Sequence, residues 1–335
     1  MVRIGLIGMG RWGRVHANTA LALPARCRLT HLATSRPEHA ALIPYPVTVL
    51  SDWRAVVRAD CEAVIIASPP DSHAEILEEC LKRGKACLVE KPLCLDAQTA
   101  ERLHQRVEAL DVPVLVNHTQ LFAPAYQQLK QTVIERGEPV RVLLSEGMGF
   151  GPFRTHTSAL WDWGPHDVSL CLDLVGEFPR AVDALGGPRG PDDHPELISL
   201  RLDFPGGACA WIQVGRLAAR KRRSLTVVTD SGCYAWDELA ADRLTASSVA
   251  FQRRYRDRVS EPLTSTTIPT HDEPPTMVRM LEYFLNGLAG GDRRLFGTGL
   301  AVDVTRVLAN CEELIARRAR GPRAAPEALG QLPHS

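Results

Sequence analysis

The stretch VRIGLIGMGRWG, residues 2–13, joins an apolar run to three glycines spaced as G-x-G-x-x-G. The apolar run at 2–7 predicts a β-strand, and a helix is expected directly after the glycines. Gly8 permits a tight turn, Gly10 lets the backbone approach a ligand closely, and Gly13 lets the helix pack on the strand. The first turn of such a helix offers free N–H groups and the positive end of a dipole. The stretch therefore predicts a phosphate-binding strand–turn–helix unit.

The same alternation of strand and helix continues to about residue 119. The run EAVIIAS at 62–68 has no polar alternation, which is typical of a strand buried on both faces in a parallel sheet. Further strands are expected at 28–34, 86–90 and 112–117, and helices at 51–58, 71–83 and 96–110. This order predicts an α/β fold in which residues 1–119 form a doubly wound Rossmann domain that binds NAD(P).

A different pattern follows residue 120. Strands are expected at 138–147, 180–185, 197–203, 209–215 and 225–228, joined in part by the turn sequences PGG at 205–207 and DSG at 230–232. Two late helices are expected at 273–290 and 297–318. We therefore predict a second, α+β domain over 120–320 with a mostly antiparallel open sheet, which binds substrate and forms oligomers. Residues 321–335 are expected to be a flexible tail.

The composition is that of an ordinary globular protein. The 39 Lys and Arg residues balance the 39 Asp and Glu residues, so the net charge does not favour a nucleic acid or an anionic membrane as partner. The nine cysteines are scattered and include no C-x-x-C pair, which favours reduced core thiols over a metal or redox site. No metal site and no secretion signal is expected, and the interpretation is a cytoplasmic protein.

The end of the second expected strand bears on the choice of cofactor. NAD enzymes of this fold usually carry an acidic residue there, which binds the 2′-hydroxyl of the ribose. This chain has Thr34, Ser35 and Arg36 instead. Because a guanidinium can form charge-assisted bonds to a 2′-phosphate, we favour NADP, and NAD stays open.

Three further motifs accompany the glycine turn: ASPPDSH at 67–73, EKP at 90–92 and WDWGPHD at 161–167. With these four motifs in this order, nearly the whole chain resembles the Gfo/Idh/MocA family, which includes glucose–fructose oxidoreductase and inositol dehydrogenases. The resemblance implies a dehydrogenase acting on a secondary alcohol or ketone of a sugar, polyol or nucleotide sugar. It also implies a homodimer or homotetramer.

The resemblance implies roles for three residues. Lys91 of the EKP motif would polarise the oxygen of the substrate. His166 would act as general acid or base, and Asp162 would orient the imidazole or bind a neighbouring hydroxyl. Pro165 suits the first turn of a helix to about residue 175, which would place His166 at the positive helix end and keep it neutral.

The residues expected to hold the cofactor share a place in the glycine turn, at the end of the second strand, or in the second and third motifs. They are Gly8, Met9, Gly10, Arg11, Trp12, Gly13, Ser35, Arg36, Ser68, Pro69, Pro70, His73, Glu90 and Lys91.

Other positions carry weaker signals. The linking segment that begins with Asn117, His118 and Gln120 lacks the arginines that family members often have there. The basic cluster formed by Arg216 and residues 220–223 is expected to be a solvated face, and the alternative is that one member binds a phosphate of the substrate. Two other functions remain open: a non-catalytic dinucleotide sensor and a glycosidase that uses NAD transiently.

Overall fold

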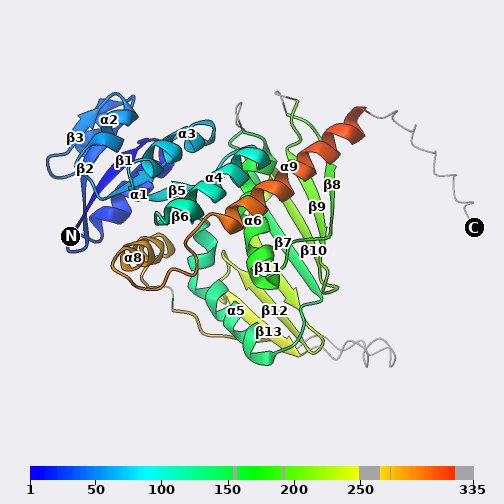
Figure 1. Cartoon of the computed structure of the whole chain (residues 1–335). Coiled ribbons are helices and arrows are strands. Elements are labelled where there is room, and N and C mark those ends of the chain that lie inside the picture. The colour runs from blue at the N-terminus through cyan, green and yellow to red at the C-terminus, as the bar shows by residue number, and fades with distance from the viewer. Residues whose placement is uncertain (154–156, 191–192, 249–264, 272, 321–335) are drawn as a thin grey trace, which may run out of the picture.

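The fold is organised around two β-sheets that lie at opposite ends of the molecule and are bridged by helices (Figure 1). The computed structural model describes residues 1–153, 157–190, 193–248, 265–271 and 273–320. The tail predicted at 321–335 lies outside these residues.

The first sheet has six parallel strands in the order β3-β2-β1-β4-β5-β6, the order of a dinucleotide-binding Rossmann fold. The strands are β1 (Val2–Ile7), β2 (Cys27–Ala33), β3 (Thr48–Leu50), β4 (Ala63–Ile66), β5 (Ala86–Glu90) and β6 (Val114–Asn117). The helices between them are α1 (Arg11–Leu21), α2 (Trp53–Arg58), α3 (Pro70–Leu81) and α4 (Ala97–Leu110). The predicted Rossmann fold is confirmed.

Local sequence explains where these elements begin. All four residues of β4 are buried, as its unbroken apolar run predicts. The carboxylate of Asp96 accepts a hydrogen bond of 2.6 Å from the backbone N–H of Thr99, which caps α4. Strand β3 and the short 3₁₀ helix η1 (Pro37–Leu42) were not predicted, because β3 has three residues and two of them are exposed.

The second sheet has eight strands in the order β14-β13-β12-β11-β7-β10-β9-β8. They are β7 (Val142–Phe150), β8 (Ala181–Gly186), β9 (Leu197–Asp203), β10 (Cys209–Gly215), β11 (Leu217–Val228), β12 (Gly232–Asp237), β13 (Leu244–Ser248) and β14 (Ser265–Thr267). Among the described strands of this sheet only β7 and β10 pair in parallel, so the predicted mostly antiparallel sheet is confirmed. Strands β12, β13 and β14 and the first half of β11 were not predicted.

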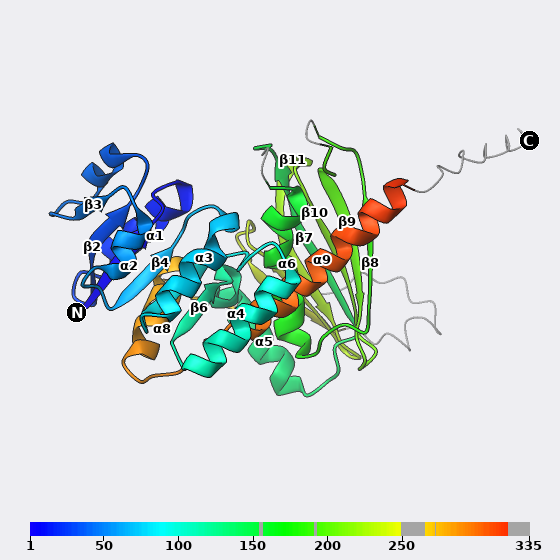
Figure 2. The same cartoon turned by 45° about the horizontal axis from the view of Figure 1, so that its top comes forward.

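Helices cover one face of this second sheet. They are α5 (Pro124–Arg136), α6 (Ala159–Val175) and α9 (Gly299–Arg320), and α9 runs diagonally along the sheet in Figure 2. Helix α5 was not predicted, because its polar sequence buries only four side chains. The opposite face stays open: Leu144 and Trp211, which are paired neighbours on β7 and β10, are 46% and 48% exposed.

The chain returns to the first sheet after it has built the second. Helix α8 (Thr276–Leu288) packs against α1 and against the 3₁₀ helix η2 (Thr119–Phe122). Gly297 then forms a parallel bridge with Leu115 of β6, and its N–H donates to the carbonyl of Val114 at 2.7 Å. The division of the chain at residues 119 and 120 therefore remains a prediction, since a late segment completes the first unit.

The start of α6 differs from the prediction. The helix begins at Ala159, capped by the hydroxyl of Ser158, and Pro165 lies inside it. Pro165 lacks the N–H that would bind the carbonyl of Trp161, so the helical hydrogen bonding is interrupted there. His166 is thus placed in the middle of α6 and not at its positive end, so the prediction that the helix dipole keeps it neutral was wrong.

Candidate functional site

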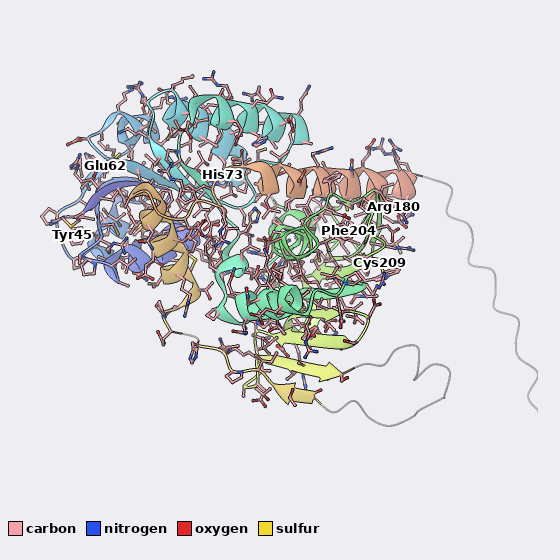
Figure 3. All side chains as sticks on the ribbon, turned by 60° about the horizontal axis from the view of Figure 1, so that its bottom comes forward. Tyr45, Glu62, His73, Arg180, Phe204 and Cys209 are labelled. Carbon is pink, nitrogen blue, oxygen red and sulfur yellow. The ribbon has the colours of Figure 1, made fainter. Side chains whose placement is uncertain are left out.

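Two adjoining cavities lie between the two sheets. The larger, of about 750 Å³, surrounds the glycine turn and the carboxyl ends of the first-sheet strands. The smaller, of about 380 Å³, lies against α6 and the second sheet. Arg11, Trp12, Lys91 and Asp162 line both cavities. In Figure 3, His73 of the larger cavity lies on the side of the Rossmann unit that faces the second sheet, and Tyr45 and Glu62 lie at the far side.

The glycine turn has the geometry that its sequence predicts. Gly8 has φ +93°, and a Cβ there would lie 2.5 Å from the carbonyl oxygen of Ala67. A Cβ at Gly13 would lie 2.0 Å from the carbonyl oxygen of Gly8. A Cβ at Gly10, in contrast, would meet no atom within 4 Å, and Gly10 lines the larger cavity. The open space beside Gly10 and the exposed start of α1 fit the diphosphate of a dinucleotide.

The loops that follow β4 and β5 are held together by His73. Its two ring nitrogens each lie 2.9 Å from a backbone carbonyl oxygen, that of Pro92 for Nδ1 and that of Ser68 for Nε2. Burial lowers the pKa of His73, although both backbone contacts oppose this shift. Ser68, Pro69 and Pro70 line the larger cavity together with His73. The imidazole therefore positions the wall that is expected to hold the cofactor. The peptide bond between Lys91 and Pro92, in the same loop, is cis.

Glu90 belongs to a buried polar network that the sequence analysis missed. Its Oε1 lies 2.7 Å from Nε2 of His16 on α1 and accepts a bond of 2.7 Å from the amide of Asn117. Burial raises the pKa of Glu90, but the bonds from His16 and Asn117 and the charge of Lys91 outweigh burial, so the net shift is downward. The network joins α1, β5 and β6 behind the cavity, and Glu90 also lines it.

The far end of the larger cavity is lined by Thr34, Ser35 and Arg36. Oγ1 of Thr34 accepts a hydrogen bond of 3.0 Å from the backbone N–H of Arg36, while the side chains of Ser35 and Arg36 are exposed. Nδ1 of His39 lies 3.0 Å from the carbonyl oxygen of Met9, which ties η1 to the glycine turn. No acidic residue is among the described residues that line this end.

Lys91 lies where the two cavities meet, and it is 8% exposed. Its Nζ donates a bond of 2.6 Å to the carbonyl oxygen of Asp162 and lies 3.8 Å from Oδ1 of that residue. The accepting carbonyl is one residue beyond the Trp161 carbonyl that Pro165 leaves without its usual helical donor. The proline inside α6 therefore interrupts the helix beside the carbonyl that fixes the ammonium group.

His166 lines the smaller cavity together with Lys91 and Asp162. Burial lowers the pKa of His166 well below its usual value, and the charges of Lys91 and Arg223 lower it further. Its Nδ1 is buried without a hydrogen-bond partner among the described residues. The imidazole is therefore neutral near pH 7, as the sequence analysis expected, but because of burial and neighbouring cations.

A second buried histidine, His118, lies close to this site. Burial lowers its pKa to about 4, and the charge of Lys91 acts in the same direction. Both of its ring nitrogens are without partners among the described residues. Its place directly after β6 was noted in the sequence, but nothing there indicated that it would be buried beside the ammonium group.

Asp162 is held from behind by Arg216, which is fully buried. A guanidinium nitrogen of Arg216 donates to Oδ2 of Asp162 at 3.2 Å and to the carbonyl of Thr157 at 2.7 Å, and another lies 3.4 Å from Glu196. The expectation of a solvated residue was wrong for Arg216. Buried residues alternate along β10 at Ala210, Ile212 and Val214, and Arg216 is the next position on that face. This alternation is the sequence pattern from which the burial of Arg216 could have been predicted.

The remaining members of the basic cluster separate along β11. Arg222 is exposed and pairs with Glu146 at 2.9 Å, as expected of a solvated face. Lys221 and Arg223 line the smaller cavity, and the guanidinium of Arg223 lies over the ring of Trp163 at 4.2 Å. Further lining residues that the sequence analysis missed are Ala123, Pro124, Ala125, Trp236, Glu238, Arg243 and Thr276.

The described residues offer neither a metal-binding cluster nor a helix that could span a membrane. No three His, Cys, Asp or Glu side chains among them are grouped so that they could hold a metal ion. In the same parts of the chain, no helix has the length and apolar character needed to cross a bilayer.

Comparison with known proteins identifies the family. Residues 2–118 match a family profile described as "Oxidoreductase family, NAD-binding Rossmann fold", and residues 147–235 match the "GFO/IDH/MocA C-terminal domain". Inositol 2-dehydrogenase of Rhizobium meliloti (strain 1021) is 30% identical over 230 residues, which cover 65% of this chain and 69% of the relative. The chain belongs to the Gfo/Idh/MocA oxidoreductase family.

Solved structures agree with this assignment. A protein from Magnetospirillum magnetotacticum MS-1 has 37% identity and a TM-score of 0.83, and the match covers 92% of this chain and 99% of that one. Levoglucosan dehydrogenase in complex with NADH has 20% identity and a TM-score of 0.80, with coverage of 94% and 97%, and supports the shared fold. The resemblance inferred from the four motifs is confirmed, and the chain is an NAD-binding oxidoreductase of this family.

Proposed function

We propose that this oxidoreductase interconverts a secondary alcohol and a ketone on a sugar, a polyol or a nucleotide sugar. The observation that carries the proposal is that Lys91, Asp162 and His166 line one cavity, which adjoins the cavity of the glycine turn. Inositol 2-dehydrogenase, the relative described above, bears the name of a polyol enzyme, which agrees with this substrate class.

The roles of the residues follow from their surroundings. A nicotinamide, when bound, accepts or supplies the hydride. The ammonium of Lys91 hydrogen-bonds the reacting oxygen of the substrate and stabilises negative charge on it. Nε2 of His166 takes the proton of the hydroxyl, or returns it in the reverse direction, which requires the neutral ring that burial provides. Asp162 positions Lys91 through its carbonyl, and Arg216 fixes the carboxylate of Asp162.

His166→Asn tests the catalytic assignment. Removal of a general acid–base group is expected to lower kcat/KM about 10²- to 10⁴-fold, measured by the absorbance of the reduced cofactor with a panel of polyols and sugars. Cofactor affinity, measured by fluorescence titration, should be unchanged. His104→Asn is the matched control, because His104 lies on α4 and bonds Thr298 away from both cavities. Equal activity in the two variants would refute the role of His166.

The diphosphate is assigned to Gly8, Met9, Gly10, Arg11, Trp12 and Gly13, and the adenosine ribose to Ser35 and Arg36. We infer a preference for NADP over NAD because the only described charge that lines the far end is that of Arg36. Arg36→Gln is expected to weaken NADPH binding about 10- to 100-fold, since a charge-assisted bond is lost, and to leave NADH binding unchanged. Equal affinity of the wild type for NADH and NADPH would remove this inference.

We also propose a homodimer or homotetramer that forms through the open face of the second sheet. Leu144 and Trp211 are adjacent and half-exposed there, and Arg201 stacks on the ring of Trp211 at 5.3 Å. Large exposed apolar side chains that cluster on a flat sheet are typical of interfaces between subunits. The cysteines support a cytoplasmic location, because all nine are free and seven are buried as thiols.

A further inference from the structure

Among the described residues that line the smaller cavity, cationic side chains outnumber acidic ones. Its cationic lining residues are Arg11, Lys91, Lys221, Arg223 and Arg243, and its acidic ones are Asp162 and Glu238. The carboxylate of Asp162 is already engaged by Arg216 at 3.2 Å and lies 3.8 Å from Lys91. Lys221 and Arg223 belong to this lining, and a neutral sugar would offer neither of them a counter-charge.

The positive charge is concentrated on strand β11. Lys221 and Arg223 are two residues apart and therefore project from the same face of the strand, toward the cavity. Arg222 lies between them, projects from the other face and pairs with Glu146. No carboxylate of the described residues lies within ion-pair distance of Lys221 or Arg223, whereas Arg222 between them has one.

Arg223 is held in a fixed orientation. Its guanidinium stacks on Trp163 of α6 at 4.2 Å, and its backbone carbonyl accepts a bond of 2.9 Å from the N–H of Glu238. The charge of Arg223 acts on the buried carboxylate of Asp167, which accepts a hydrogen bond of 2.6 Å from Ser145. Asp167 does not line the cavity. A guanidinium positioned in advance loses little entropy when it binds a planar or tetrahedral anion.

We propose that the substrate carries a carboxylate or phosphate group whose oxygens bind Lys221 and Arg223 while its reacting hydroxyl lies at Lys91 and His166. The proposal rests on the dehydrogenase function proposed above and specifies its substrate. The cavity of about 380 Å³ is near the lower end of the range for small-molecule sites, so the substrate is the size of a monosaccharide. A sugar acid or a sugar phosphate satisfies both requirements.

Binding to the full chain saturated with reduced cofactor tests this proposal without any need for turnover. Two matched pairs of probes are compared by calorimetry: glucuronate with glucose, and myo-inositol 1-phosphate with myo-inositol. The anionic member of at least one pair is expected to bind about 10-fold or more tightly, and the pair that responds identifies carboxylate or phosphate as the group. The preference should weaken as salt is raised. Equal binding within both pairs would overturn the proposal.

Variants locate the effect. Lys221→Gln and Arg223→Gln are each expected to reduce the preference for the anionic probe about 10-fold, while Arg222→Gln, on the opposite face of the same strand, should leave it unchanged. Lys221 is exposed, so its variant tests the site even if Arg223→Gln fails to fold. An equal effect of Arg222→Gln would refute the site. A retained preference without turnover of any probe would count only against the dehydrogenase function.

Discussion

Replacement by alanine is expected to have opposite effects at Gly10 and at Gly13. A Cβ at Gly10 meets no atom within 4 Å, and its backbone φ of −71° suits alanine. A Cβ at Gly13 lies 2.0 Å from the backbone oxygen of Gly8, which cannot move aside as a flexible side chain can. Gly10→Ala should therefore leave the fold intact and weaken cofactor binding, whereas Gly13→Ala should destabilise the fold.

Magnitudes follow from these contacts. Without cofactor, Gly10→Ala should raise the free energy of unfolding by about 0.4–1 kcal/mol, because the unfolded chain loses conformational freedom. Gly13→Ala should lower it by about 1–3 kcal/mol or more, as overpacking does. With cofactor, the methyl group of Gly10→Ala occupies the space expected for the diphosphate. The loss of one charge-assisted bond from the backbone, about 1.5–3 kcal/mol, corresponds to binding that is about 10- to 150-fold weaker.

Two measurements separate the variants. Chemical denaturation without cofactor gives the change in stability, and fluorescence titration with NADH and NADPH gives the change in affinity. If Gly10→Ala were less stable than the wild type without cofactor, or bound both cofactors as tightly, the assignment of the diphosphate to the space beside Gly10 would be refuted.

Three further predictions concern the rest of the site and the assembly. Arg216→Met should lower the free energy of unfolding by about 3–5 kcal/mol, because two carboxylates lose a buried partner; a loss below about 1 kcal/mol in chemical denaturation would contradict this. His118 has a pKa of about 4 when folded and about 6.5 when unfolded, so stability should fall by up to about 1.4 kcal/mol per unit as pH drops from 6.5 toward 4. The pKa of Asp167 is raised to about 6, so protonation of this carboxyl opposes part of the loss. Denaturation at pH 7, 6 and 5 should show that the free energy of unfolding declines less steeply for His118→Asn than for the wild type. Equal slopes would exclude the effect. Trp211→Arg should yield monomers in analytical ultracentrifugation, and an unchanged mass would place the interface elsewhere.

Local patterns in the sequence predicted the parts of the fold that depend on neighbours along the chain. The glycine turn and the buried run of β4 each act within a few residues, and each element formed where its pattern indicated. Lys91 and His166 were brought into one cavity as the motif resemblance implied.

The parts that were missed depend on contacts between distant residues. Arg216 is buried because Asp162 and Glu196 meet it from 54 and 20 residues away, and no local pattern announces such partners. The start of α6 was misplaced because Pro165 favours a first turn in general, whereas here the packing of the helix tolerates it inside. The return of α8 to α1 has no periodicity that distinguishes it from any amphipathic helix.

That return has a consequence for biosynthesis. Because Gly297 and α8 complete the dinucleotide unit only near the end of the chain, the ribosome must release almost the whole polypeptide before α1 and β6 acquire their last neighbours. If folding followed the order of synthesis, as is common for successive domains, the surfaces of α1 and β6 that contact α8 and Gly297 would stay exposed until the end of translation. The nascent protein should therefore depend on chaperones until translation ends, and its two sheets should gain protease resistance together.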